Sequence, residues 1–117
     1  MTTSADGQPL IPQPPATVAA LRQAVRRIAP ETLAAFTREL DRAADRSLQG
    51  SDPAPLRRFI AQWAVHVHIR RRPGLAADLR RWEDLAETGD AAQARRAASE
   101  IGRILDEAHA VVGLPAR

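Results

Sequence analysis

Hydrophobic residues recur every three or four positions along most of this 117-residue chain. The first such run is Val18, Leu21, Val25 and Ile28, whose spacing places them on one face of an α-helix. Four later segments repeat the pattern. The periodicity predicts a first helix that follows Thr17 and is closed by Pro30, and further helices at about 31–49, 53–71, 75–88 and 91–112.

The residues between these segments carry helix start and stop signals. Thr17 is a candidate N-cap and Gly50 a candidate C-cap. Ser51-Asp52-Pro53 places proline after two capping residues, as at a helix start, whereas Arg72-Pro73-Gly74 breaks the third helix. Gly89-Asp90 ends the fourth helix and caps the fifth. Amphipathic helices joined by loops this short predict an all-α fold, a compact bundle of about five helices.

Each amphipathic helix has a stripe that we expect to be buried. In the second helix the stripe is Leu33, Phe36, Leu40, Ala44 and Leu48. In the fourth helix it is Leu75, Leu79, Trp82 and Ala86. In the fifth helix it is Ala94, Ala98, Ile101, Leu105, Ala108 and Val112. These side chains are the predicted core of the bundle.

The third helix is apolar on two faces. Phe59, Ile60, Trp63 and Val67 share one face, and Ala61, Val65 and Ile69 lie on the opposite one. Such a helix lies at the centre of its bundle or covers a partner with its second face. We favour the central position, since a five-helix domain needs one such element. Alternation of apolar and polar residues over 64–69 also fits a β-strand, but no second strand-like run exists to pair with it, so we predict helix there.

The chain divides into three parts by composition. Residues 1–16 hold four prolines among small polar residues, and we expect a disordered, Pro-rich N-terminal arm. Pro9-Leu10-Ile11-Pro12 has the PxxP spacing, but this short pattern is common, and we interpret it as part of a flexible leader. Residues 17–113 form the single helical domain, and 114–117 a short C-terminal tail.

Composition removes several classes of chemistry. The chain has no Cys, which excludes disulfides and thiolate ligands. All 17 basic residues are Arg, which excludes a Schiff-base lysine and a P-loop lysine. His66 and His68 are two positions apart, so on a helix they point in different directions and do not form a metal pair. We expect no catalytic, cofactor-binding or metal-binding residues and no enzymatic activity.

The location of the protein is predicted from its apolar segments. No basic n-region with an apolar run begins the chain. The longest apolar-rich stretch, 59–69, falls far short of a membrane span. We therefore expect a cytoplasmic protein.

Positive charge is concentrated on the third helix. Its ends carry Arg57, Arg58, Arg70, Arg71 and Arg72. One interpretation is that Arg70, Arg71 and Arg72 complement the negative end of the helix dipole. The other is that all five arginines form a contact patch for an acidic protein or a phosphate backbone. A helix-turn-helix is a further alternative, but its recognition helix would carry Glu83, Asp84 and Glu87, which phosphates repel.

Three runs of the sequence resemble a known family. Pro9-Leu10-Ile11-Pro12, Leu21 to Pro30, and Leu56-Arg57-Arg58-Phe59 through Trp63-Ala64 to Arg71-Arg72-Pro73 are similar to short actinobacterial proteins that are classed as a domain of unknown function. Genes of that family often lie beside RelE/ParE-type toxin genes. The family tends to be acidic where this chain has His66, His68 and Arg70, and no catalytic residues carry over.

Two functions follow as expectations. The first is a non-enzymatic protein-interaction module; the resemblance implies an antitoxin-like role with a RelE/ParE-type toxin as its protein partner. The alternative is a nucleic-acid-binding regulator that uses the arginine-rich helix.

Overall fold

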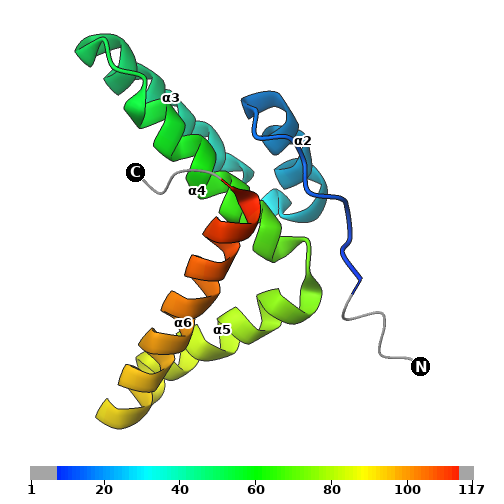
Figure 1. Cartoon of the computed structure of the whole chain (residues 1–117), viewed down its shortest axis with the longest axis vertical. Helices are drawn as coiled ribbons and strands as arrows, with labels where there is room; N and C mark the ends of the chain where they lie inside the picture. Colours follow the sequence, from blue (N-terminus) through cyan, green and yellow to red (C-terminus); the bar gives the residue numbers. More distant parts are fainter. Residues whose placement is uncertain (1–7, 114–117) are drawn as a thin grey trace.

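A computed structural model describes residues 8–113, and this part of the chain is all-helical (Figure 1). It contains five α-helices and one short 3-10 helix. The elements are α2 (Val18–Ile28), η1 (Pro30–Thr32), α3 (Leu33–Gly50), α4 (Ala54–Arg70), α5 (Pro73–Thr88) and α6 (Ala91–Val112). The predicted all-α class and helix number are confirmed, and α4 also covers the segment where a strand was the alternative.

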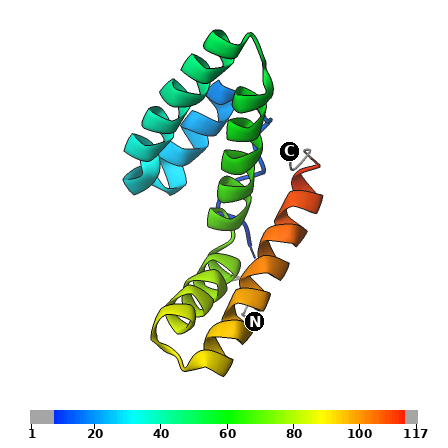
Figure 2. The same ribbon diagram turned by 90° about the vertical axis from the view of Figure 1, so that its left-hand side faces the viewer.

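The helices form two antiparallel hairpins, and the central helix of the first also contacts the second. Helices α3 and α4 make the first hairpin, against which α2 packs, and α5 and α6 make the second (Figures 1 and 2). Within the described residues α5 contacts only α4 and α6, so the second hairpin extends away from α2 and α3. The described chain therefore has an elongated outline, 46 × 37 × 25 Å.

Helix α4 contributes buried side chains to two separate core clusters. The first cluster joins α2, α3 and α4 and consists of Leu21, Ala24, Val25, Phe36, Ala43, Phe59, Trp63, Ala64 and Val67. The second joins α4 and α6 and consists of Val65, Ile69, Ile104 and Ala108. The predicted central position of the third helix is confirmed, because its two apolar faces are each covered by a different group of helices.

Two helix ends differ from the prediction. Gly50 is the last residue of α3, and the left-handed capping position falls on Ser51, whose φ is 48°. Pro73 does not lie in a break but opens α5, because the first turn of a helix needs no N–H from it. The caps at Thr17 and Asp90 are confirmed: each side chain accepts a backbone N–H three residues later.

The expected stripes were wrong for several side chains. Leu48 is 79% exposed, because α3 extends beyond the helices that cover it. No residue of α5 is fully buried. In α6 the buried seam is Ala97, Ile104 and Ala108, whereas Leu105 is 37% exposed. The seam follows the line where α6 meets both α4 and α5, which the periodicity of α6 alone does not define.

The expectation of a disordered arm over 1–16 is not confirmed where the structure describes it. The Leu10 amide donates to the Arg71 carbonyl at 2.7 Å, and the Gln13 side chain donates to the Ala64 carbonyl at 3.3 Å. Ile11 packs against the first core cluster. Residues 8–16 thus follow α4 in an extended conformation. Residues 1–7 and the predicted tail 114–117 lie outside the described residues.

Candidate functional site

The five arginines of the predicted contact patch do not lie together. Arg57 and Arg58 are exposed in the first turns of α4, and Arg70, Arg71 and Arg72 lie at its other end, about 18 Å away at 1.5 Å per residue. The three at the C-terminal end also differ from one another in exposure and partners. The patch is therefore two separate basic sites at opposite ends of α4.

Arg70 is engaged within the fold. Its guanidinium lies 2.6 Å from the Glu31 carboxylate, which belongs to η1. The pKa of the Glu31 carboxyl is lowered, first by a hydrogen bond from its own backbone and then by the hydrogen bond from Arg70. The pair ties the end of α4 to the turn between α2 and α3, so Arg70 is a structural contact rather than a free cation.

Arg71 was predicted to be an exposed contact residue, but this is wrong, because the residue is only 8% exposed. Its Nε donates to Gln13 Oε1 at 3.0 Å, and a terminal nitrogen donates to the Ile11 carbonyl at 3.2 Å. Arg71 therefore fastens the N-terminal segment to α4. Burial and the neighbouring charge of Arg72 lower its pKa. A docking protein cannot reach this side chain as it could an exposed arginine.

At the other end of α4, Arg58 lies near two arginines of α3 that the predicted contact patch did not include. Arg42 and Arg46 of α3 line a cavity of about 340 Å³ together with Arg58. Glu39 lies at its border and accepts a hydrogen bond from Trp63 Nε1 at 3.0 Å. The spacing of four between Arg42 and Arg46 was the available signal, since it puts both on one helix face. Their meeting with Arg58 depends on how α3 and α4 pack.

His66 lies against α2 and η1. The Thr32 hydroxyl donates to the Ala29 carbonyl at 2.8 Å, and His66 Nε2 lies 3.4 Å from the same oxygen. The Trp63 ring lies edge-on at 4.8 Å. Burial first, and then the charge of Arg70, lower the pKa of His66.

His68 lies on a different side of α4, as its spacing predicted. It is buried, and its Nδ1 has no hydrogen-bond partner in the described structure. Burial, followed by the charges of Arg71 and Arg72, lowers its pKa. The two histidines line separate cavities, His66 with Arg80 and Glu83, and His68 with Arg71 and Arg72. Within residues 8–113 no group of three or more His, Asp or Glu side chains could hold a metal ion.

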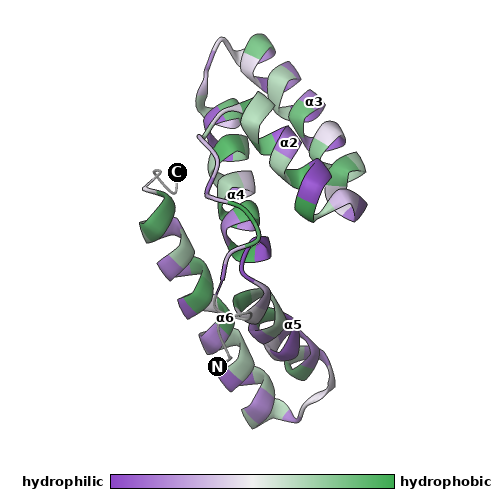
Figure 3. Cartoon of the chain, turned by 90° about the vertical axis from the view of Figure 1, so that its right-hand side faces the viewer, coloured by the Kyte–Doolittle hydropathy of each residue, from purple (hydrophilic) through white to green (hydrophobic). Residues whose placement is uncertain are grey.

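The outward part of the second hairpin leaves large apolar side chains partly uncovered. Trp82 and Leu85 line an open, mainly apolar hollow of about 440 Å³ on α5. Arg96 of α6 reaches over the Trp82 ring, 5.6 Å from its centre. Hydrophobic and hydrophilic residues alternate along this hairpin, at the end of the molecule away from α2 and α3 (Figure 3). Leu75, Leu79 and Trp82 pack against the second core cluster, but none of them is fully buried.

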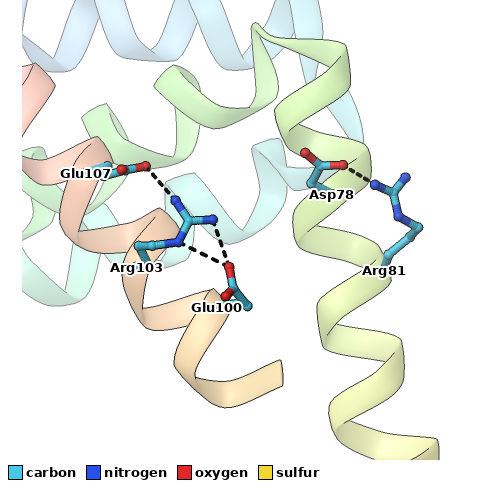
Figure 4. Close-up of polar contacts among 5 residues, drawn as sticks. All are labelled: Asp78, Arg81, Glu100, Arg103 and Glu107. Carbon is cyan, nitrogen blue, oxygen red and sulfur yellow. Dashed lines mark hydrogen bonds and ion pairs between the residues drawn. The ribbon is translucent and has the colours of Figure 1, made fainter. Parts of the chain in front are cut away.

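Charged residues beside this apolar surface pair along their own helices. Arg103 lies between Glu100 and Glu107 on α6, at 2.8 and 3.3 Å, and Arg81 pairs with Asp78 on α5 (Figure 4). These exposed pairs contribute little to the stability of the fold. They keep the hairpin charged around its apolar strip, an arrangement that is also found at the polar rims of protein interfaces.

Comparison with known proteins adds no relative. No family model, no curated protein and no solved structure matches the chain. Among the described residues no helix is long and apolar enough to cross a membrane.

Proposed function

We propose that this chain is a non-enzymatic protein-interaction module that binds its partner through the α5–α6 hairpin. The observation that carries the proposal is the state of α5. It has Leu75, Leu79, Trp82 and Leu85, yet none of its residues is fully buried. A sixteen-residue helix with this content is normally covered on its apolar face. Coverage by a partner would add the burial that α4 and α6 do not provide.

The charges around this surface indicate the chemistry of the partner. Helix α5 carries four carboxylates, Asp78, Glu83, Asp84 and Glu87, against two arginines. Asp84 is exposed and lines the Trp82 hollow, and Glu87 is exposed three residues later in α5. Complementary charge favours encounter and suppresses wrong partners. The proposed occupant is therefore a protein surface with an apolar ridge and basic residues around it.

The antitoxin-like role, with a RelE/ParE-type toxin as the partner, is a narrower form of this proposal. It rests on the family resemblance of the sequence. Its test is co-expression of the chain with the product of the adjacent gene. A stable one-to-one complex that suppresses the toxicity of that product is the expected result.

A charge-reversal pair tests the general proposal. The hairpin variant is Asp84→Arg with Glu87→Arg, and the matched control is Asp41→Arg with Asp45→Arg on exposed positions of α3. Both variants change the charge equally and leave the core untouched. The tagged full chain should co-purify a stoichiometric partner from its native cell, and the hairpin variant should lose that partner while the control retains it.

Hydrogen exchange in the purified complex supplies the second readout. We expect added protection of amides in α5 and α6, with α2 and α3 unchanged. A chain that purifies without any stoichiometric partner contradicts the proposal. So does a partner that the control variant loses and the hairpin variant keeps.

Nucleic-acid binding is the second candidate function, and one observation favours it. Arg42, Arg46 and Arg58 gather around one cavity with no ion pair to any carboxylate in the described structure. Arginine side chains grouped in this way suit phosphate groups, which they bind through several N–H donors. This grouping replaces the five arginines of α4 as the candidate phosphate contact.

A mobility-shift titration at two salt concentrations tests this second function. Phosphate binding by these arginines must weaken steeply with salt. Replacing Arg42, Arg46 and Arg58 by Gln should make the slope of log affinity against log salt shallower by about 3 for duplex DNA. The matched control replaces Arg80, Arg81 and Arg95, which are exposed on the other hairpin. The absence of any shift at low salt ends this second proposal.

A further inference from the structure

A groove of about 560 Å³ lies where the end of α4, the start of α5 and the last turns of α6 meet. Its cationic side is formed by His68, Arg71 and Arg72, and its apolar side includes Leu75, Ile104 and Val111. The size is within the range of small-molecule sites, which also combine apolar walls with a few polar groups. The groove is separate from the Trp82 hollow and from the cavity of Arg42, Arg46 and Arg58.

Among residues 8–113, no carboxylate pairs with the arginines of the groove. Arg71 is buried, and its protein acceptors are two neutral oxygens, of Gln13 and Ile11. No carboxylate of residues 8–113 lies within 4.0 Å of Arg71 or Arg72. Buried charges in proteins are normally paired, because desolvation is otherwise uncompensated. Two adjacent arginines without an acid favour an anion in this place.

His68 is the second and independent observation. The residue is 6% exposed and borders the groove, and its Nδ1 is buried without a hydrogen-bond partner. Its place three residues before Arg71 and four before Arg72 puts the three side chains on neighbouring positions at the helix end. The pKa of His68 and the pKa of Arg71 are both lowered, first by burial and then by neighbouring positive charge.

The opposite wall determines which kind of anion fits. Val111 is 63% exposed, and Ile104 and Leu75 continue the apolar surface into the groove. Glu107 borders the groove too, but its carboxylate is paired with Arg103 at 3.3 Å. An inorganic phosphate would use the arginines and leave the apolar wall in contact with water. An alkyl chain attached to the anionic group would cover that wall, at about 0.8 kcal/mol per methylene buried, or about fourfold in affinity.

From this juxtaposition we propose that the groove binds a small organic carboxylate with an apolar chain. The carboxylate lies between Arg72 and the His68 ring, and Arg71 supplies the N–H donors that Gln13 and Ile11 leave free. The chain lies along Leu75 and Val111. The groove includes Leu75 of α5 and residues of α6, but neither the Trp82 hollow nor the exposed carboxylates of α5 take part in it. Loss of the protein partner in the Asp84→Arg, Glu87→Arg variant and loss of octanoate binding are therefore separate results.

The test is a titration of the full chain with octanoate, below its micelle concentration, followed by NMR of the histidine rings. The chain has three histidines, so each ring signal can be assigned. We expect His68 to shift on titration and its pKa to rise, because a carboxylate beside it favours the charged ring. His66 lies in a different cavity and is the internal control, whose signal and pKa should not move.

Variants identify the two halves of the site without touching the buried Arg71. Arg72→Gln should weaken octanoate binding by about tenfold, the value of one charge-assisted hydrogen bond. Val111→Asp should weaken it at least as much, by adding a repelling charge to the apolar wall. Arg46→Gln, at the far end of α4, should leave binding unchanged.

Ligand analogues decide whether both chemical halves matter. Acetate has the carboxylate without the chain, octan-1-ol has the chain without the charge, and both should bind at least about tenfold more weakly than octanoate. Inorganic phosphate should not compete at equal concentration. Equal affinity for phosphate and octanoate, or an octanoate titration that moves His66 and leaves His68 unchanged, overturns the proposal.

Discussion

Replacing Phe36 by Leu should destabilise one part of the molecule and leave another unaffected. Phe36 is fully buried in the first core cluster. Its ring packs edge-on against Phe59 at 5.0 Å and Trp63 at 5.1 Å, and the Arg22 guanidinium lies 5.7 Å from its centre. Leucine keeps most of the volume but loses these ring contacts. Each aromatic pair contributes about 0.5–1.5 kcal/mol, so we expect a loss of about 2 kcal/mol.

The division into two clusters determines where this loss is felt. The second hairpin contacts α4 but neither α2 nor α3, and its cluster has four buried residues against nine in the first. We expect α5 and α6 to open locally while α2–α4 stay folded. Phe36→Leu changes the free energy of global unfolding but not that of this local opening.

Native-state hydrogen exchange measures both free energies at once. In Phe36→Leu the amides of α2 and α3 should exchange about 30-fold faster, the equivalent of 2 kcal/mol, and those of α5 and α6 at the unchanged rate. Ile104→Ala, in the second cluster, is the matched control and should accelerate exchange in all helices, since its contacts are lost in both kinds of opening. Equal acceleration in α3 and α6 by Phe36→Leu would refute the reasoning and show that the chain unfolds as one unit.

Four further changes have expected outcomes in unfolding experiments. Ser51→Gly should stabilise the chain by about 1 kcal/mol in urea denaturation, because the left-handed φ of 48° suits glycine. Gly89→Ala should destabilise it by about 1–3 kcal/mol, because the new Cβ would lie 2.8 Å from the Leu85 carbonyl. Changes in unfolding free energy of the same sign for the two variants would contradict this account of the two positions. Asp90→Ala removes the capping box of α6 and should cost about 1 kcal/mol, and an unchanged melting temperature would mean that the cap is not formed in solution. His66 and His68 both have a lowered pKa in the folded chain. The stability that they contribute is therefore present above about pH 6.5, where the rings of the unfolded chain are neutral. It is lost as the pH falls through about 6.5 toward the pKa values of the folded chain. Thermal unfolding between pH 7 and 5 should show this loss, and His66→Gln with His68→Gln should flatten it.

The candidate sites depended on tertiary contacts more than the helices did. The sequence grouped five arginines by their position on one helix, but α4 is long enough to separate them into two sites. Arg42, Arg46 and Arg58 come together only because α3 and α4 are antiparallel neighbours. No local pattern specifies this meeting, since each arginine by itself is an ordinary exposed residue of an amphipathic helix.

The N-terminal segment shows the same limit. Its prolines and small residues predict that it cannot form a helix, and residues 8–16 are indeed extended. The composition cannot predict that backbone carbonyls of Ala64 and Arg71 accept hydrogen bonds from Gln13 and Leu10. Nor can it predict that the Arg71 side chain donates to Gln13. Order in that segment comes from a surface formed by residues about sixty positions away.

By itself the sequence determined the class of the fold, the number of helices and most of their ends, and the central place of α4. These properties follow from short-range physics: periodic burial, caps and proline each act within a few residues. Only the tertiary structure decided which face of α6 is buried, that α5 has no fully buried residue, that Leu48 is exposed and that Arg71 is not. Those outcomes depend on which helices lie side by side and how far each extends past its neighbour, and a periodicity within one helix carries no information on either.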